Sequence, residues 1–268
     1  MDHPRQARRG ARQHRVWAIV TGLARQELLR RYAGSAIGAL WVILQPLLLV
    51  LTYWFVFSLA LRMQVDGTVP FLLTFVAGFI PWLTFQEVIT QSAVSVTGNP
   101  HLVKKIVFPV ELLPVVHLCA ALVSHAVMLV IMVALLVVDG RSLTVRVLEL
   151  PYYALALCIL ALAFGWFVAA LNVFVRDTSH ALTSLLGVWF WLTPIVWPVS
   201  ALPSAYRGLV ELNPFWYVVT GYRSALLGGE PAWSDPAAAL RFWLIALPCL
   251  VAGLLTFRRL RHDFADLL

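Results

Sequence analysis

Long runs of apolar residues alternate with short polar segments along the chain. After 36 mostly polar residues, six apolar runs follow, and turns rich in charge, glycine or proline separate them. A helix needs about 20 apolar residues to cross a hydrocarbon core of roughly 30 Å. The pattern therefore predicts six transmembrane helices, at residues 37–61, 70–90, 111–138, 151–175, 181–199 and 237–257.

Composition supports a membrane protein. Hydrophobic residues make up 61% of the 268 residues and charged residues only 12%, whereas soluble domains carry about 25% charged residues. The first run is long, follows a polar segment and has no small-residue cleavage pattern, so we interpret it as a retained span rather than a signal peptide. The expected fold is an all-α integral membrane protein with a cytoplasmic region at 1–36 and a six-span domain at 37–268.

The distribution of cations predicts the orientation, because short basic loops stay on the cytoplasmic side. With the N-terminus inside, the inner segments hold fourteen lysines and arginines and the outer segments hold six. Both termini are therefore expected in the cytoplasm, and the net charge of +7 is attributed to this orientation rather than to nucleic-acid binding. The three cysteines lie in predicted spans without CxxC spacing, which indicates neither a disulfide framework nor a zinc site.

The stretch NPHLVKKIVFPV, residues 99–110, contains both lysines of the chain. Asn99 is a good N-cap, Pro100 suits the first helical position and Pro109 disfavours a helix before it, so a two-turn helix is predicted at 99–108. One face of this helix carries the polar residues and one aromatic ring: His101, Lys104, Lys105 and Phe108. It is either an interfacial helix whose lysines reach lipid phosphates or a docking helix whose ring enters a groove on a cytoplasmic partner.

The first 36 residues are predicted to form a basic arm and an interfacial helix. Residues 1–15 carry five arginines and no apolar period, and from residue 16 onward the apolar residues share one side of a helix. Glu27 and Arg31 have the i, i+4 spacing of an ion pair. Three arginines before the first span are either a topology anchor or a contact for substrate phosphates: Arg25, Arg30 and Arg31.

The segment between the last two predicted spans, residues 200–236, is too apolar for an ordinary loop. It contains two short helical stretches, broken at Asn213–Pro214 and ended by Gly228–Gly229, and neither is long enough to cross a bilayer. Irregular backbone at membrane depth is tolerated only where protein or a water-filled path shelters it. We therefore predict a re-entrant pair of helices that lines the outer mouth.

Four stretches together resemble one family: RRYAGSAIGALWVILQPLLL (30–49), the Asn-Pro/Lys-Lys/Phe-Pro helix, LNVFVRDTSHALTSLLGVWFWLTPIVWPVSALP (171–203) and LNPFWYVVTGYRSALLGG (212–229). Their order and spacing are similar to the permease subunit of type-2 ABC exporters, in the subfamily that exports lipid-linked O-antigen, capsular and teichoic-acid polymers. The resemblance implies a homodimer in the bacterial inner membrane and two separate cytoplasmic ATPase subunits, which hold the ATP and Mg²⁺.

The resemblance also implies roles for particular residues. It makes residues 99–108 a coupling helix that contacts the ATPase, through Asn99, Pro100, His101, Lys104, Lys105 and Phe108. It makes residues 200–236 an external gate, with Asn213, Pro214, Tyr217, Tyr222 and Arg223 as its candidate residues. The arginines before the first span then become candidates for the headgroup of a lipid-linked glycan.

Aromatic residues are concentrated in the second and fifth predicted spans. Pro194 frees a carbonyl in the fifth span and invites a kink, which a cavity accommodates more easily than lipid does. Sugar rings have apolar C–H faces that can slide over aromatic rings, so we expect a glycan path lined by Trp82, Phe85, Trp189, Trp191 and Trp197. Packing in the interior of the bundle is the alternative for the same residues.

The sequence also limits which chemistry this chain performs. The phosphate-binding loop GxxxxGK[ST] requires a lysine followed by serine or threonine, but Lys104 precedes Lys105 and Lys105 precedes Ile106. ATP hydrolysis is therefore expected on another polypeptide. This chain is expected to be a transport subunit with no catalytic residue, no metal site and no cofactor of its own.

Three alternatives stay open. A permease of the same superfamily for a lipid or a drug-like molecule would share the features described above. An ion-coupled transporter would place ionisable groups near mid-membrane and often show an internal repeat. Only His117 and His125 suggest such groups, and hydrogen-bonded histidines inside a bundle explain them better. An intramembrane enzyme would have only these histidines, Ser35 and Ser124 as raw material.

Overall fold

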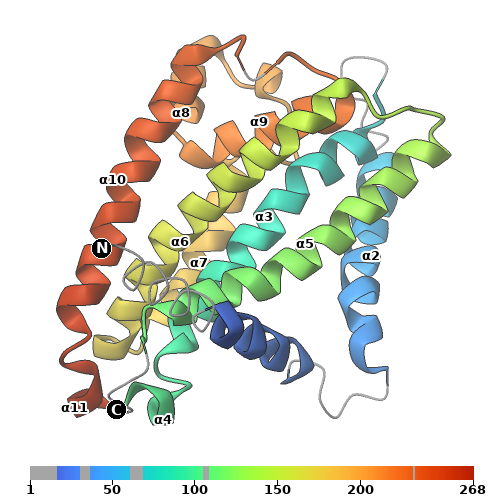
Figure 1. Cartoon of the computed structure of the whole chain (residues 1–268). Helices are drawn as coiled ribbons and strands as arrows, with labels where there is room; N and C mark the ends of the chain where they lie inside the picture. Colours follow the sequence, from blue (N-terminus) through green and yellow to red (C-terminus); the bar gives the residue numbers. More distant parts are fainter. Residues whose placement is uncertain (1–16, 31–36, 61–68, 105–108, 232) are drawn as a thin grey trace, which may run out of the picture.

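The computed structural model describes residues 17–30, 37–60, 69–104, 109–231 and 233–268, and every regular element in these ranges is helical (Figure 1). A helix at residues 17–30 precedes the elements η1 (Gly38–Leu40), α2 (Trp41–Tyr53), η2 (Trp54–Ala60), α3 (Phe71–Ser95), α4 (Pro100–Val103), α5 (Leu112–Val138), η3 (Val145–Glu149), α6 (Leu150–Phe174), α7 (Thr178–Leu192), η4 (Val199–Ala201), α8 (Ser204–Glu211), α9 (Pro214–Leu227), α10 (Pro236–Leu260) and α11 (Phe264–Leu267).

Five helices in the described ranges are long and apolar enough to cross a membrane: Trp41–Ala60, Phe71–Ser95, Leu112–Val138, Val145–Phe174 and Pro236–Leu260. They match five of the six predicted spans, with ends shifted by a few residues, and the predicted all-α membrane fold is confirmed.

The fifth predicted span needs a correction. We expected a continuous helix over 181–199, but α7 has only 15 residues and ends at Leu192. At 1.5 Å per residue it is about 22 Å long, which is less than a hydrocarbon core. Thr193 is extended, with ψ of 129°, because the following Pro194 disfavours helical geometry in the residue before it.

The helix α3 is the centre of the bundle. It packs against α5, α6 and α9 and touches α7, while α10 runs along the outer side of α6 (Figure 1). Its buried aromatic residues recur every four positions, at Phe71, Phe75 and Phe79, and Tyr53 of α2 stacks on Phe75 with 4.4 Å between ring centroids. The segment Trp41–Ala60 is otherwise largely exposed.

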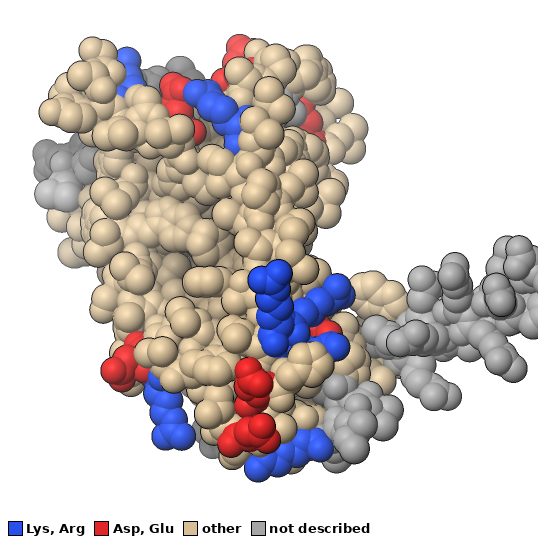
Figure 2. All heavy atoms as spheres, turned by 90° about the vertical axis from the view of Figure 1, so that its left-hand side faces the viewer, with Lys and Arg blue, Asp and Glu red and all other residues tan. Residues whose placement is uncertain are grey.

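Charged side chains gather at the two ends of the molecule on the face formed by α10, and an uncharged belt separates them (Figure 2). Such a belt is what a bilayer requires, because charges inside hydrocarbon are costly. The helix at 17–30, α4 and α11 lie at one end of the bundle, called here the α4 end. The short helices α8 and η3 lie at the opposite end, called the α8 end.

The helices α6 and α10 cross closely at Gly253. A Cβ atom added to Gly253 would lie 2.2 Å from the backbone carbonyl oxygen of Ala163, which leaves no room for a side chain. Small residues at such crossings let helix backbones approach each other, and dispersion contacts then hold the helices together in lipid. Gly253 therefore sets the distance between α6 and α10.

We expect Gly253→Ala to force these two helices apart and to lower the thermal unfolding temperature by several degrees, since overpacking costs about 1–3 kcal/mol. Gly187→Ala in α7 is the matched control, because nothing lies within 4 Å of a Cβ atom added there. Thermal unfolding of both variants in the same detergent measures the difference. Equal unfolding temperatures would show that the close crossing does not limit stability.

Candidate functional site

A cavity of about 660 Å³ lies among α2, α3, α5 and α7, and we call it the mid-bundle cavity. Amides and hydroxyls line part of it: Gln45, Gln86, Thr90, Gln91, Ser124 and Thr183. Aromatic rings line another part: Trp41, Tyr53, Phe79, Trp82, Phe190 and Trp191. Polar hydrogen-bonding groups beside flat apolar rings suit a ligand that carries both hydroxyl groups and C–H faces.

Two of the five aromatic residues predicted for a glycan path line this cavity. Trp82 is only 2% exposed and donates its indole N–H to Gln86 Oε1 at 3.0 Å. Trp191 is 56% exposed and lines the cavity from α7. Trp197 lies close by, because its indole N–H donates to the Trp191 carbonyl at 2.9 Å. The three tryptophans therefore differ greatly in exposure.

The other two predicted residues, Phe85 and Trp189, pack in the interior of the bundle. Their ring centroids lie 5.2 Å apart, and Phe164 packs against Trp189 at 5.3 Å. Neither side chain lines the mid-bundle cavity. For these two residues the alternative interpretation holds: they pack in the bundle interior and do not line a glycan path.

His125 connects the cavity to helices on either side. Its Nδ1 lies 2.8 Å from Thr84 Oγ1 of α3, and its Nε2 lies 3.1 Å from the hydroxyl oxygen of Tyr222 in α9. The histidine itself lines the cavity from α5. The interpretation of His125 as a hydrogen-bonded residue inside the bundle is confirmed. Its bonds join α3, α5 and α9 at one point.

The broken end of α7 is held by a partly buried arginine. Arg223 of α9 donates to the carbonyl oxygens of Pro194 at 2.8 Å and Ile195 at 2.6 Å. It also donates to Thr74 O of α3 at 3.0 Å. Burial lowers the pKa of Arg223 to about 10, so the guanidinium remains cationic at neutral pH. Hydrogen bonds from a charged donor are stronger than neutral ones, so this contact ties α7 and α3 to α9.

Asn213 joins the same two elements from the start of α9. Its Oδ1 accepts hydrogen bonds from Phe215 N and from the indole N–H of Trp189, both at 3.0 Å. Its Nδ2 donates to Thr193 Oγ1 at 2.9 Å. Asn213 therefore caps α9 and fastens it to the end of α7 with one side chain.

The two short helices predicted in residues 200–236 are confirmed as α8 and α9. They are separated at Asn213–Pro214, and Gly228 ends α9 with a φ of 80°, a value that favours glycine. One face of α9 is buried, and α9 packs against α3, α6 and α10. Tyr217, another predicted gate residue, has its hydroxyl oxygen 2.9 Å from that of Tyr152 in α6.

The predicted helix at 99–108 is described only in its first half. It begins with Pro100 at the first helical position, as predicted, but the Asn99 side chain donates back to Ser95 O at 2.9 Å instead of capping the helix. His101 and Lys104 are exposed. Lys105 and Phe108 lie outside the described residues.

The C-terminal helix α11 supports α4 from the inside of the α4 end. Phe264 is 0% exposed and packs against Phe257 and Phe174, with ring centroids 5.3 and 6.2 Å away. Leu102 and Val103 of α4 pack against the same cluster. The apolar side of α4 therefore packs against α11, and its polar residues His101 and Lys104 remain exposed.

The helix at residues 17–30 contacts protein as well as presenting exposed residues. Val20 and Ala24 are buried against Val116 of α5, so part of the face predicted to lie among lipid headgroups packs on the bundle. Of the three predicted headgroup arginines, Arg25 is exposed and Arg30 pairs with Glu27 at 2.9 Å. Arg31 lies outside the described residues.

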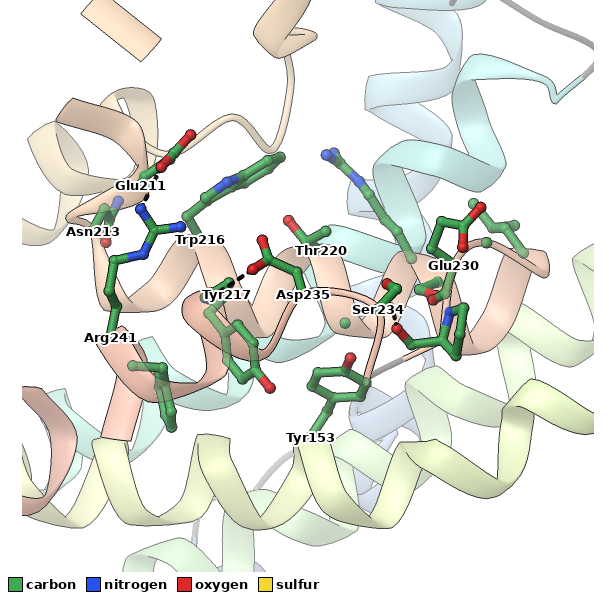
Figure 3. Close-up of a pocket in the computed structure, with 18 of the residues that line it drawn as sticks. Tyr153, Glu211, Asn213, Trp216, Tyr217, Thr220, Glu230, Ser234, Asp235 and Arg241 are labelled. Atoms are coloured by element: carbon green, nitrogen blue, oxygen red, sulfur yellow. Dashed lines mark hydrogen bonds and ion pairs between the residues drawn. The ribbon is translucent and has the colours of Figure 1, made fainter. Parts of the chain in front are cut away.

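A second cavity of about 670 Å³ lies at the α8 end, between α9 and α10, and we call it the α9–α10 pocket (Figure 3). It contains Asn213, Tyr217 and Arg223, which the sequence had indicated, together with residues that it had not: Tyr153, Trp216, Thr220, Glu230, Asp235 and Arg241. The spacing of Trp216, Thr220 and Ser224 by four residues was an available signal, because it places them on one face of a helix. No comparable spacing in the sequence indicated that residues of α10 would line this pocket.

Comparison with known proteins gives a consistent result. The family model described as "ABC-2 type transporter" matches residues 20–227. The "O-antigen export system permease protein RfbA" of Myxococcus xanthus is 30% identical over 254 residues, which are 92% of this chain and 94% of that protein. A Klebsiella pneumoniae protein of the same name is 27% identical over 254 residues, 94% of this chain and 96% of that protein. The "Polysialic acid transport protein KpsM" of Escherichia coli is 24% identical over 243 residues, 89% of this chain and 92% of that protein.

We expect Arg223→Gln to destabilise the protein strongly, because each hydrogen bond from a charged group contributes about 1.5–3 kcal/mol and three backbone carbonyls would lose their donor. Arg207→Gln is the matched control, since Arg207 is exposed and donates to Leu202 O at the surface. Thermal unfolding and labelling of a cysteine placed at residue 193 would report both stability and loosening of the junction. An Arg223→Gln protein as stable and as protected as the control would contradict this role.

Proposed function

Because the chain belongs to the ABC-2 type transporter family, we propose that it is the membrane-spanning permease subunit of an ATP-driven exporter of a lipid-linked polysaccharide. The names of the relatives support this substrate class, since two of them export O-antigen and one transports polysialic acid. The main structural support for this function is the lining of the mid-bundle cavity, in which amides and hydroxyls lie beside aromatic rings. Such a lining hydrogen-bonds hydroxyl groups and contacts the C–H faces of sugar rings without binding one unit tightly.

The alternative of a lipid or drug-like substrate fits this lining less well. An apolar substrate would displace water from the amides of Gln45 and Gln91 and from the side-chain NH2 of Gln86, whose oxygen already accepts from Trp82, without replacing those hydrogen bonds. Each unsatisfied group would cost about 1–3 kcal/mol. A glycan offers hydroxyl groups to all three amides. The polar lining therefore favours a sugar polymer over an apolar molecule.

A second copy of the chain is proposed to complete the path. Apolar side chains of α2 and α7 are exposed next to the polar mid-bundle cavity, among them Leu47, Leu51, Leu185 and Leu192. A polar cavity that opened onto lipid would leave its hydrogen-bonding groups unsatisfied. Two copies that meet along α2 and α7 would cover both the apolar faces and the cavity, and a two-fold symmetric pair is the commonest arrangement of this kind.

The α4 end is proposed to face the cytoplasm of a bacterial cell, in its inner membrane, where two ATPase subunits bind. Two observations support this placement. The lysine pair belongs to the segment that contains α4, and short basic segments remain cytoplasmic. His101 and Lys104 are exposed on α4 while Leu102 and Val103 pack against the α11 cluster, so α4 presents a polar surface to a partner.

Deletion of the gene for this chain tests the proposed function directly. We expect the lipid-linked polymer to accumulate inside the cell and the same polymer to disappear from the cell surface. Complementation with the intact gene should restore both. Normal surface polymer in the deletion strain, with an unchanged lipid-linked pool inside, would contradict polysaccharide export by this protein.

We expect Trp191→Ala to reduce polymer export at least several-fold while leaving the stability of the complex nearly unchanged, because the ring is exposed and lines the cavity. Trp189→Ala should instead lower stability, since Trp189 packs in the interior and donates a hydrogen bond to Asn213. Export and thermal unfolding are measured on both variants, with Leu244→Ala as a control on the exposed side of α10. Export lost only in proportion to folded complex would remove Trp191 from the path.

The double variant Lys104→Glu with Lys105→Glu should weaken stimulation of ATP hydrolysis by substrate while the permease still inserts, because charge reversal disrupts a complementary surface. Phe108→Ala should act in the same direction, since truncating an interface anchor typically costs about 2 kcal/mol or more. Co-purification with the ATPase and ATPase assays measure the effect. Unchanged stimulation in both variants would assign the segment to the membrane surface instead.

A further inference from the structure

We propose that the α9–α10 pocket is a binding site for a neutral sugar unit of the polymer, occupied after that unit leaves the mid-bundle cavity. The proposal rests on the export function proposed above and adds a second site with its own specificity. The pocket volume of about 670 Å³ falls within the roughly 300–1,000 Å³ range of small-molecule sites. It is therefore large enough for one or a few sugar rings.

The position of the pocket follows from the two faces of α9. Tyr222 faces the bundle and bonds to His125, which lines the mid-bundle cavity. Trp216 and Thr220 line the α9–α10 pocket from the other side of the same helix (Figure 3). A polymer that passes α9 toward the α8 end therefore meets this pocket next.

The lining contains aromatic rings together with polar groups that make no hydrogen bond to another described residue. Tyr153 is only 4% exposed, and its hydroxyl makes no hydrogen bond to any residue that the structure describes. The same is true, among the described residues, of the Trp216 indole N–H and the Thr220 hydroxyl. These three groups line the pocket without being fully buried, so they can bond to a ligand that carries hydroxyl groups. In the same lining the Arg241 Nε atom is buried and has no hydrogen-bond partner among the described residues, and buried polar atoms normally have one.

Tyr153 is held in place for this role by Gly221. A Cβ atom added to Gly221 would lie 2.0 Å from Tyr153 Cε1, so the tyrosine ring lies directly against the backbone of α9. The Tyr217 ring, whose hydroxyl pairs with that of Tyr152, stacks on Phe242 with 4.9 Å between centroids. Aromatic residues from α6 and α9 thus form a fixed surface rather than a mobile one.

The charges of the pocket select for a neutral unit. Arg241 is paired with Glu211, and Arg223 is committed to three backbone carbonyls. The carboxylates of Glu230 and Asp235 form no salt bridge with a described residue, although Asp235 also caps α10 through Ala238 N. Two unpaired carboxylates accept hydrogen bonds from sugar hydroxyls but repel anionic sugars.

The test uses the complete exporter complex in nanodiscs and short, delipidated chains released from the organism's own surface polymer. A second probe is the same chains after their primary hydroxyls are oxidised to carboxylates. We expect the unmodified chains to bind with a dissociation constant in the millimolar range and the carboxylated chains at least tenfold more weakly. Trp216→Ala should weaken binding of the unmodified chains at least tenfold.

Two further variants keep the test decisive if Trp216→Ala is poorly folded. Thr220→Trp fills the pocket from an exposed helix position and should abolish binding, whereas Glu230→Gln removes one exposed charge and should raise the affinity for the carboxylated chains. Trp233→Ala is the matched control, because Trp233 is exposed at the same end, beside Arg146, and does not line the pocket.

Three outcomes would overturn the proposal: unchanged binding in Thr220→Trp, equal or tighter binding of the carboxylated chains, or no binding at all by a complex that exports polymer in cells. The last result would leave the export function standing. Absence of polymer export in cells would instead remove the proposed function and this site together.

Discussion

The backbone carbonyls freed at the end of α7 are the constraint on which the arrangement of the α8 end depends. A helix that stops inside a membrane protein leaves carbonyl groups that water cannot satisfy, and each must find a donor within the protein. Arg223 supplies donors for Pro194 and Ile195, and Asn213 binds the adjacent Thr193 side chain. Both donors come from α9, so the break in α7 and the buried position of α9 require each other.

This junction also organises the two cavities. The last turn of α7 places Trp191 beside the mid-bundle cavity, and the chain directly after α7 is bonded to α9 through the carbonyls of Pro194 and Ile195. Contacts from α9 then reach His125 in the cavity wall and Thr74 in α3. A movement of α9 would therefore change the mid-bundle cavity and the α9–α10 pocket at the same time.

The features of the structure that could be predicted from the sequence were those that depend only on residues close together in the chain. Apolar run length located five of the six predicted spans, and Asn213–Pro214 and Gly228 marked the ends of α8 and α9, because proline and glycine act through the backbone alone. Trp189 and Trp191 show where prediction stopped. They are two residues apart, yet one packs in the interior and the other lines the cavity, and that difference depends on which neighbours cover each face of α7. Likewise Arg223 was a candidate from its position, but its carbonyl partners are as many as 149 residues away and no local pattern specifies them.

The central claim is that a glycan passes through the mid-bundle cavity during ATP-driven export. Site-specific photocrosslinking in the working complex tests it most directly, with a photoreactive residue at position 187 in the cavity wall and another at position 244 on the exposed side of α10. The account predicts a polymer adduct at 187 that requires ATP hydrolysis and no polymer adduct at 244. Equal adducts at both positions, or adducts at 187 with lipid alone during active export, would contradict it.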